Sequence, residues 1–352
     1  MRVSSEHIKL DFKFPAGTSR GILKEKSSWI IRIHDKNKIG IGEVSVIEGL
    51  SPEFNTQQAF ERNLKDYINK FETCLNENFI SETLMDYFIK THPSILAFPS
   101  IIFGFESAYL DFKNGGKQIY FDNDFTAGKT VIPINGLVWM GNESFMQEQL
   151  KEKIEIGFTT IKMKVGAIDW FKELKIIDQL RENYSKNDLT IRLDANGAFK
   201  AEEVKQKLHQ LRDFEIHSIE QPIKRGQWQL MKELCEENII PIALDEELIG
   251  IIGISNKIEL LETIMPHYII LKPSLHGGFS GTKEWIELAD QKQINWWITS
   301  ALESNVGLNA ICQFAANYPI SIPQGLGTGG LYLNNFPSDL AVDRGFIFKQ
   351  RN

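Results

Sequence analysis

Residues 160–166 read TIKMKVG, and this short stretch predicts a strand with one apolar and one cationic face. Side chains alternate across a strand, so the apolar residues share one face and the two lysines share the other. If the apolar face packs on helices, Lys162 and Lys164 point into the interior of a closed sheet. Taken alone, the segment leaves one alternative open, an edge strand with two solvated lysines.

Similar apolar segments repeat along the chain at intervals of about 25 to 30 residues, the length of one strand–helix unit. The stretches between them carry helical periodicity, most clearly at residues 171–181. Eight such units predict an α/β fold, a closed (β/α)8 barrel over residues 131–330. An open doubly wound sheet is the alternative, although no GxGxxG motif follows a first strand. The candidate strands are residues 132–138, 159–165, 189–194, 216–220, 241–245, 268–272, 295–300 and 322–326.

The first 130 residues have a different order, with strands followed by a run of helices. This order predicts a separate α+β domain over residues 1–130. We expect the C-terminal tail, residues 331–352, to pack back on it. The candidate strands are residues 28–33 and 40–44, and the candidate helices are residues 56–73, 81–90 and 100–112.

Composition narrows the class of protein. The net charge of −7 lacks the basic excess of a protein that tracks a phosphate backbone. No window reaches the roughly 18 consecutive apolar residues of a membrane span, and the N-terminus lacks the apolar core of a signal peptide. Three scattered cysteines do not predict a disulfide framework or a zinc ribbon. We therefore expect a soluble cytoplasmic protein that acts on a small molecule, with no obligate protein partner.

Three consecutive candidate strands end on a carboxylate, namely Asp194, Glu220 and Asp245. Glu220 follows Asp194 by 26 residues and Asp245 follows Glu220 by 25, so each advances by one strand–helix unit. Singly, these residues could be a turn former, a surface acid and a helix cap. Active sites of parallel barrels lie at the carboxyl ends of the strands, so the shared register predicts that the three converge there.

Three converging carboxylates repel one another unless a cation lies between them. An all-oxygen donor set suits a hard ion, so we expect Mg²⁺, with Mn²⁺ as a substitute. None of the seven histidines lies at the carboxyl end of a candidate strand, and His217 is expected to face outward.

Lys272 ends the sixth candidate strand with inward parity, opposite Lys164 on the second. Asn196 follows Asp194 on the same face of the third. A carboxylate substrate bound to the metal would thus have an ammonium on either side. Metal coordination stabilises the enediolate that forms when the α-proton is removed, and a lysine can serve as the base.

The two lysines of TIKMKVG, the three carboxylates and Lys272 together resemble the muconate-lactonizing subgroup of the enolase superfamily. Residues 42–44 (GEV) and 103–108 (FGFESA) resemble the capping domain of that superfamily, so the resemblance spans nearly the whole chain. It implies the modified enolase barrel, a metal bound by the three carboxylates, and two catalytic lysines.

Within the subgroup, residues 299–308 and 325–329 are similar to members that act in menaquinone biosynthesis. Those members catalyse the syn dehydration of a succinyl-hydroxycyclohexadiene carboxylate to 2-succinylbenzoate. The resemblance implies that Lys164 removes the α-proton and then helps the β-hydroxyl to leave. Lys272 would stabilise the enediolate, and Lys162 would reach the substrate carboxylate or tune Lys164.

The resemblance also implies contacts to the rest of the substrate. A capping loop at residues 17–21 would close over the site, and flanking glycines allow such loops to move. The expected substrate contacts are Asn196, Ser300, Gly327, Thr328 and, from the capping loop, Arg20.

Other reactions fit the same constellation. In an N-succinyl- or N-acylamino acid racemase the two lysines would be opposed bases, and a cycloisomerase is a further alternative. A dipeptide epimerase needs carboxylates for a substrate ammonium, and residues 325–330 contain none. A class I aldolase using a lysine Schiff base would leave the three carboxylates unexplained. A non-catalytic binding protein would leave both the lysines and the carboxylates unexplained.

Overall fold

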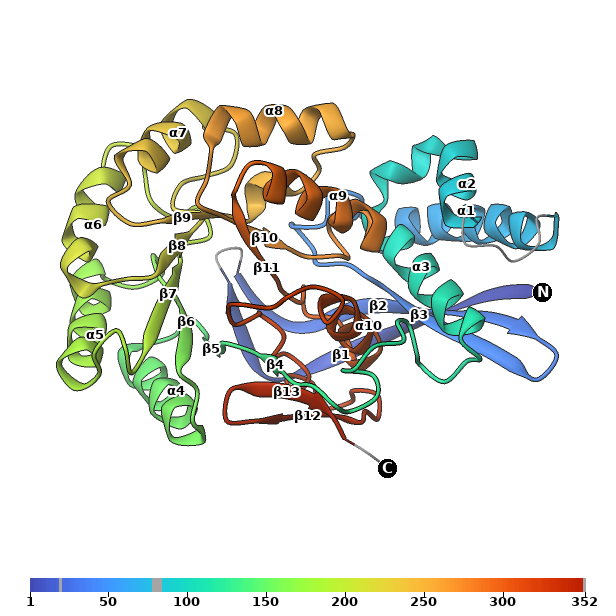
Figure 1. The fold of residues 1–352 in the computed structure, drawn as a ribbon, viewed down its shortest axis with the longest axis horizontal. Coiled ribbons are helices and arrows are strands. Elements are labelled where there is room, and N and C mark those ends of the chain that lie inside the picture. The colour runs from blue at the N-terminus through green and yellow to red at the C-terminus, as the bar shows by residue number, and fades with distance from the viewer. Residues whose placement is uncertain (19–20, 78–83, 351–352) are drawn as a thin grey trace.

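The computed structural model describes residues 1–18, 21–77 and 84–350. Figure 1 shows two regions: an N-terminal sheet with its own helices, and a curved sheet flanked by helices α4 to α8. The chain passes from the first region to the second after residue 113.

The N-terminal region is a three-stranded antiparallel sheet in the order β1-β2-β3. The helices predicted at residues 56–73 and 100–112 form close to their expected bounds. The one predicted at 81–90 is helical from Leu84, and residues 81–83 lie outside the described residues. The long strand β1 was not predicted. Helix α3 lies tightly on β3, because a Cβ at Gly42 would stand 2.2 Å from the carbonyl oxygen of Gly104. The elements are β1 (Arg2–Thr18), β2 (Gly21–Asp35), β3 (Lys38–Ser45), α1 (Gln57–Glu77), α2 (Leu84–Thr91), η1 (Pro93–Ala97) and α3 (Pro99–Lys113).

The second region is a curved sheet of seven parallel strands in chain order from β5 to β11. The strands are β5 (Gly136–Val138), β6 (Thr160–Lys164), β7 (Thr190–Asp194), β8 (Ser218–Glu220), β9 (Ile242–Leu244), β10 (Tyr268–Leu271) and β11 (Asn295–Ile298). The helices are α4 (Glu143–Ile156), α5 (Trp170–Asn183), α6 (Val204–Leu211), α7 (Trp228–Glu237), α8 (Ile254–Ile264), α9 (Gly278–Gln291) and α10 (Asn305–Ala315), with short turns η2 (Arg212–Phe214) and η3 (Glu246–Leu248).

The pattern of TIKMKVG is confirmed. Strand β6 pairs with β5 on one side and β7 on the other, so the edge-strand alternative was wrong. Ile161, Met163 and Val165 are fully buried in the main apolar cluster, which also contains Ile176 and Ile177 of α5. The face that carries the lysines therefore points to the inside of the curved sheet.

Two strand predictions were wrong. Residues 132–138 do not form one strand, because β4 (Ile132–Pro133) leaves the parallel sheet to pair with β13. Residues 322–326 form no regular strand. Gln324 and Gly325 make only isolated parallel bridges, to Ile134 and Thr299 respectively. Proline has no backbone N–H for a ladder, and a proline lies in each segment.

The bridging segment still connects the two ends of the sheet through backbone hydrogen bonds. The N–H of Gln324 donates to the Pro133 carbonyl at 2.8 Å, and the N–H of Gly325 donates to the Ile298 carbonyl at 2.9 Å. Residues 324–325 thus lie between β11 and the segment that leads into β5.

The C-terminal tail contacts both regions. The N–H of Lys13 in β1 donates to the Leu331 carbonyl at 2.9 Å, and the N–H of Leu333 donates to the Asp11 carbonyl at 2.8 Å. Strands β12 (Leu340–Asp343) and β13 (Phe346–Lys349) then form a small antiparallel sheet with β4. The tail therefore lies against β1 first and against the start of the second region afterwards.

The orientation of His217 differs from the prediction. His217 does not face outward, because its ring lies 5.1 Å from that of Tyr268 and 6.5 Å from that of Trp297. It precedes β8, so strand parity does not apply to it.

All three cysteines are buried, and none forms a disulfide in the described part of the chain. No described helix has the length and apolar character to cross a membrane.

Candidate active site

Strand register brings the predicted site residues to one height. In the β6–β7 pair Lys164 stands beside Asp194, and in the β7–β8 pair Asp194 stands beside Glu220. Asp245 follows β9 directly. The predicted convergence of the three carboxylates at the carboxyl ends of adjacent strands is therefore confirmed as geometry.

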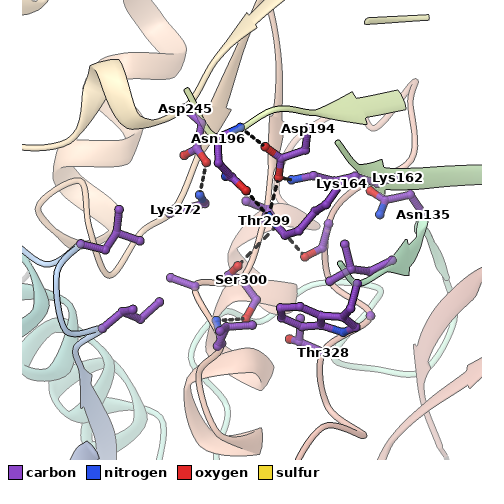
Figure 2. Close-up of a pocket in the computed structure, with 18 of the residues that line it drawn as sticks. Asn135, Lys162, Lys164, Asp194, Asn196, Asp245, Lys272, Thr299, Ser300 and Thr328 are labelled. Atoms are coloured by element: carbon purple, nitrogen blue, oxygen red, sulfur yellow. Dashed lines mark hydrogen bonds and ion pairs between the residues drawn. The ribbon is translucent and has the colours of Figure 1, made fainter. Parts of the chain in front are cut away.

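Three lysine ammonium groups lie among the three carboxylates. The Nζ of Lys162 is 2.9 Å from Asp194 Oδ2 and 2.7 Å from Glu220 Oε2. The Nζ of Lys164 is 2.8 Å from Asp194 Oδ2 and donates to Asn196 Oδ1 at 2.5 Å. Figure 2 shows Lys164 beside Asp194 and Lys272 beside Asp245, with Asn196 between the two pairs. The formal charges of the three lysines and the three carboxylates sum to zero.

Burial makes these charges interdependent. Burial opposes ionisation of Asp194, yet Lys162 and Lys164 hold the pKa of this carboxyl below its ordinary value. Burial would lower the pKa of Lys162, but Asp194 and Glu220 outweigh it and raise that pKa. Burial and the nearby Asp194 raise the pKa of Glu220 well above its ordinary value. Of the three carboxylates, Glu220 is thus the one whose ionised form a further cation would stabilise most.

The Asp245–Lys272 pair behaves similarly. Burial opposes both charges, but Lys272 lowers the pKa of Asp245, while Asp245 and Glu220 raise the pKa of Lys272. The backbone N–H of Lys272 donates to Nδ1 of His276 at 3.0 Å. Burial lowers the pKa of His276 to about 3, so this ring is a neutral acceptor at pH 7. Sequence reasoning missed His276, because it lies in the loop after β10.

A pocket opens above the charge cluster. Most of the predicted site residues line it: Lys162, Lys164, Asp194, Asn196, Asp245, Lys272, Ser300, Gly327 and Thr328. Glu220 does not line the pocket and is paired with Lys162. Arg20 lies outside the described residues, so its contact with substrate stays a prediction.

Two predicted substrate contacts differ in how their hydroxyl groups are used. The Ser300 hydroxyl donates to Glu303 Oε2 at 2.6 Å and accepts from the Leu302 N–H at 3.0 Å. It therefore holds its own loop in shape. By contrast, Thr328 Oγ1 is buried without a hydrogen-bond partner among the described residues. Thr328 thus has a hydroxyl available for a ligand.

Several pocket residues were not predicted. Asn135, Trp139 and Thr299 come from loops whose sequences carry no charged motif, and Glu246 directly follows Asp245. Ile47 and Leu50 come from the N-terminal region, so the pocket is completed across the two regions. Glu246 had a signal in its position next to a predicted ligand, and Thr299 had one as the first residue of the family-like segment 299–308.

The three carboxylates supply oxygen donors that could hold a divalent ion. In the described part of the chain, no three acidic, histidine or cysteine side chains enclose one metal position. The lysine ammonium groups instead lie against the carboxylate oxygens. The donor set still fits a hard cation, because it is all oxygen and Asp245 Oδ1 is buried with no hydrogen-bond partner in the part of the chain that the structure describes. Binding of an ion would require the ammonium groups to retract.

Comparisons with known proteins show similarity over the whole chain. The chain is 46% identical to an o-succinylbenzoate synthase from Desulfotalea psychrophila, over 99% of this chain and 98% of that protein. A crystal structure of MenC from the same organism has a TM-score of 0.87, with 41% identity and 99% of each chain covered.

More distant similarity extends to other activities. An L-Ala-D/L-Glu epimerase from Francisella tularensis subsp. novicida is 25% identical over 69% of this chain and 68% of that protein. A dipeptide epimerase from Enterococcus faecalis, solved with Mg and a dipeptide, shares the fold. Its TM-score is 0.83 at 18% identity, with 99% of this chain and 96% of that chain covered.

The family match covers more than half of the chain. The model of the family described as Enolase C-terminal domain-like matches residues 145–348, which include both catalytic candidates and all three carboxylates. Together with the 46% identical relative, this match shows that the chain belongs to the enolase superfamily.

Proposed function

We propose that the protein is an Mg²⁺-dependent o-succinylbenzoate synthase that produces 2-succinylbenzoate in menaquinone biosynthesis. The observation that carries this proposal is the 46% identity to such an enzyme over 99% of the chain. The described site supports it, because Asp194, Asp245 and three lysines line one pocket, and the buried Glu220 pairs with one of those lysines, Lys162.

Asp194, Glu220 and Asp245 would hold the metal. When bound, Mg²⁺ would supply the positive charge that offsets the charge developing on the substrate carboxylate. Lys162 bridges Asp194 and Glu220 in this structure, and we propose that it turns toward the substrate carboxylate or toward Lys164.

Lys164 would carry the proton through the reaction. Its neutral Nζ removes the α-proton, which leaves the electron pair on the substrate. The same ammonium then donates that proton to the β-hydroxyl as the C–O bond breaks. Water leaves and the ring becomes aromatic, so atoms and electrons balance. Asn196, whose Oδ1 accepts from Lys164 at 2.5 Å, would orient the amine.

Lys272 would act from the other side of the substrate. The family resemblance implies that an ammonium there stabilises the enediolate by its charge and transfers no proton. On that ground we assign proton transfer to Lys164 and electrostatic stabilisation to Lys272.

The remaining contacts would hold the succinyl arm. Thr328 offers a buried hydroxyl without a partner, and Gly327 leaves its backbone accessible to the pocket. Ser300 would contribute through the loop that its hydroxyl stabilises. We further propose that Arg20 and the capping loop at residues 17–21 close over the bound substrate.

The larger organisation follows the same proposal. We propose a capping domain at residues 1–130, joined by the tail at residues 331–352, and a catalytic domain at residues 131–330. Residues 324–325 would occupy the eighth strand position of a modified barrel, since they hydrogen-bond to both ends of the seven-stranded sheet. We propose a cytoplasmic location, which suits three buried thiols.

A second candidate is N-succinylamino acid racemization, favoured by the position of Lys164 and Lys272 on two sides of the carboxylate cluster. The deciding assay compares the cyclohexadiene substrate with N-succinylamino acids in D₂O. Dehydration that far exceeds α-deuterium exchange supports the synthase. Exchange at an equal or higher rate would refute it as the main activity.

The metal requirement is tested separately. Treatment with EDTA should abolish dehydration, and added Mg²⁺ should restore it. A class I aldolase would instead resist EDTA and form a borohydride-reducible adduct with its substrate.

A further inference from the structure

Gln221 directly follows the candidate ligand Glu220 and has no part in the proposed chemistry. It is fully buried, and its backbone φ of 40° lies in the left-handed region that residues with a side chain seldom adopt. Such a conformation costs free energy and persists only where surrounding contacts hold it. Its contacts therefore indicate what the conformation serves.

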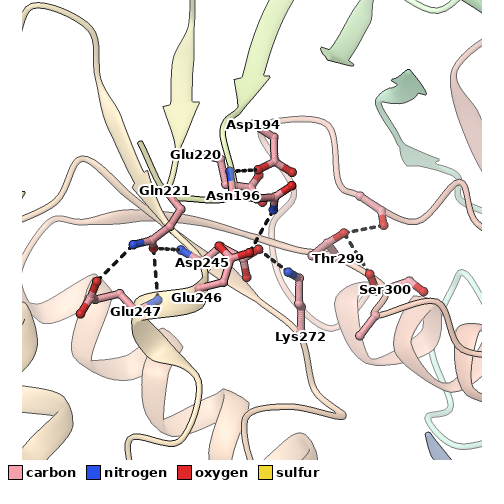
Figure 3. A network of polar contacts seen from close by, with 12 residues as sticks. Asp194, Asn196, Glu220, Gln221, Asp245, Glu246, Glu247, Lys272, Thr299 and Ser300 are labelled. Carbon is pink, nitrogen blue, oxygen red and sulfur yellow. Dashed lines mark hydrogen bonds and ion pairs between the residues drawn. The ribbon is translucent and has the colours of Figure 1, made fainter. Parts of the chain in front are cut away.

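The side-chain amide of Gln221 binds the loop that carries Asp245. Its Oε1 accepts from the Asp245 N–H at 3.3 Å and from the Glu247 N–H at 3.1 Å. Its Nε2 donates to Glu247 Oε2 at 3.1 Å and to the Ile223 carbonyl at 3.0 Å. Figure 3 shows the amide between the loops after β8 and β9. Both amide hydrogens and the amide oxygen are thus engaged.

The backbone of Gln221 reaches the third ligand loop. Its carbonyl accepts from the N–H of Gly197 at 2.6 Å, three residues after Asp194. Its own N–H donates to the carbonyl of Ala243 at 2.9 Å, two residues before Asp245. One residue therefore bonds to the loops that follow β7 and β9 while its own chain carries Glu220.

Glu247 anchors the other end of this contact. It is 3% exposed, and its Oε1 accepts from the Gly226 N–H and from Trp228 Nε1, each at 2.7 Å. Its Oε2 is the acceptor for Gln221. The carboxylate thus ties the loop after β9 to the start of α7.

We propose that Gln221 and Glu247 form a clamp that sets the spacing of the three candidate metal ligands and thereby the metal affinity of the site. Both are positioning residues, since the bonds described here are to protein groups. The inference rests on the proposed function, because it takes Asp194, Glu220 and Asp245 as ligands. It adds the residues that determine how tightly the ion is held.

The test is Mg²⁺ binding by isothermal titration calorimetry on the full chain, with Gln221→Leu as the main variant. Leucine approximates the volume of glutamine and removes all four side-chain hydrogen bonds. We expect the Kd for Mg²⁺ to rise about 10- to 100-fold, the usual cost of losing an outer partner of a metal ligand. Saturating Mg²⁺ should recover most of kcat. Gln227→Leu is the matched control, because that amide donates within its own loop, to the Lys224 carbonyl.

Glu247→Gln keeps the test decisive if Gln221→Leu does not fold. This variant preserves size but leaves only one oxygen to serve Gly226, Trp228 and Gln221, so the Mg²⁺ Kd should again rise. A folded variant of either kind with wild-type Mg²⁺ affinity overturns the clamp, even if its melting temperature falls. Absence of Mg²⁺ binding by the wild-type protein would instead refute the proposed function.

Discussion

Two sets of buried carboxylates in this molecule are held by different partners. Asp194, Glu220 and Asp245 at the pocket lie against lysine ammonium groups. The second set lies where the N-terminal region meets the loops and helices of the parallel sheet, and its partners are neutral N–H and O–H donors. Its members are Glu43, Glu106 and Glu303.

The contacts of the second set bridge distant parts of the chain. Glu43 on β3 accepts from the N–H of Ser304 at 3.0 Å and from the N–H of Gly307 at 2.9 Å. Glu106 on α3 accepts from the N–H groups of Phe279 and Ser280, in the first turn of α9. A carboxylate at a helix N-terminus also interacts favourably with the helix dipole.

The difference separates a binding function from a structural one. An ammonium group on a flexible side chain can move away and let a metal ion take its place. Backbone N–H groups cannot move in this way, so Glu43 and Glu106 hold the two regions together. Glu303 instead accepts within the second region, from Ser274, Ser300 and Ala301. Changes in the first set should alter activity, whereas changes in the second should alter stability.

The largest expected effect is on catalysis, from Lys164→Ala. Loss of the proposed base should lower kcat for dehydration by about 10²- to 10⁴-fold, the usual contribution of general acid–base catalysis. The melting temperature should change little, and Lys172→Ala on α5 serves as a surface control. Dehydration within threefold of the wild-type rate would exclude Lys164 as the base.

The next largest effect is on stability, from Glu43→Gln. The amide of the variant has one acceptor oxygen, whereas the hydrogen-bond donors around Glu43 now share two carboxylate oxygens. Lys26, which is buried nearby, also loses the negative charge that favours its ammonium form. We expect the free energy of unfolding to fall by about 3 to 4 kcal/mol. Chemical denaturation measures this, and Glu6→Gln, which removes an exposed ion pair with Arg32, should cost under about 1 kcal/mol. Equal losses in the two variants would contradict the structural role.

Glu106 should make the free energy of unfolding depend on pH, with an effect slightly smaller than that of Glu43→Gln. Burial raises its pKa from 4.5 to about 7, so the folded state retains a proton that the unfolded state releases. Its contribution to stability is therefore fully present below about pH 4.5 and is lost as pH rises through about 7. Across that window we expect a loss of roughly 2 to 3 kcal/mol from this group.

Glu106→Gln should remove this group's contribution to the pH dependence of the free energy of unfolding. Denaturant unfolding of the wild type and the variant at pH 5, 6, 7 and 8 measures it. If the free energies of unfolding of the two proteins run parallel across the series, Glu106 does not titrate in this range.

The smallest expected effect is at Thr328. Thr328→Val replaces a buried hydroxyl without a partner by a methyl group of the same shape. If the hydroxyl binds the succinyl arm, KM should rise about tenfold, near the net value of one hydrogen bond to a charged group. The value of kcat should stay within twofold. An unchanged KM would place the arm elsewhere in the pocket.

The fold was predictable where the signal was local and repeated. Strand β6 carried its alternation within seven residues, and the 25- and 26-residue spacing of the carboxylates followed from complete strand–helix units. The strand predictions at residues 132–138 and 322–326 were wrong in detail. Apolar content alone did not reveal that β4 pairs with β13, or that residues 324 and 325 make only isolated bridges.

The site was predictable where charge fell at a strand end, and not where a contact joins distant segments. Gln221 looked like an ordinary residue after Glu220, and nothing local indicated that its amide reaches the loop after β9. His276 and Glu303 were missed for the same reason. Their partners lie in loops whose approach depends on how neighbouring strands pack.

By itself the amino-acid sequence determined the alternation of the strands, the level of the three carboxylates and the inward direction of the lysines. These follow from backbone periodicity, which is a property of short segments. Only the tertiary structure decided which ammonium group meets which carboxylate, how Gln221 joins three loops, and how Glu43 and Glu106 tie the two regions together. Those contacts depend on distances between segments far apart in the chain, which no local pattern encodes.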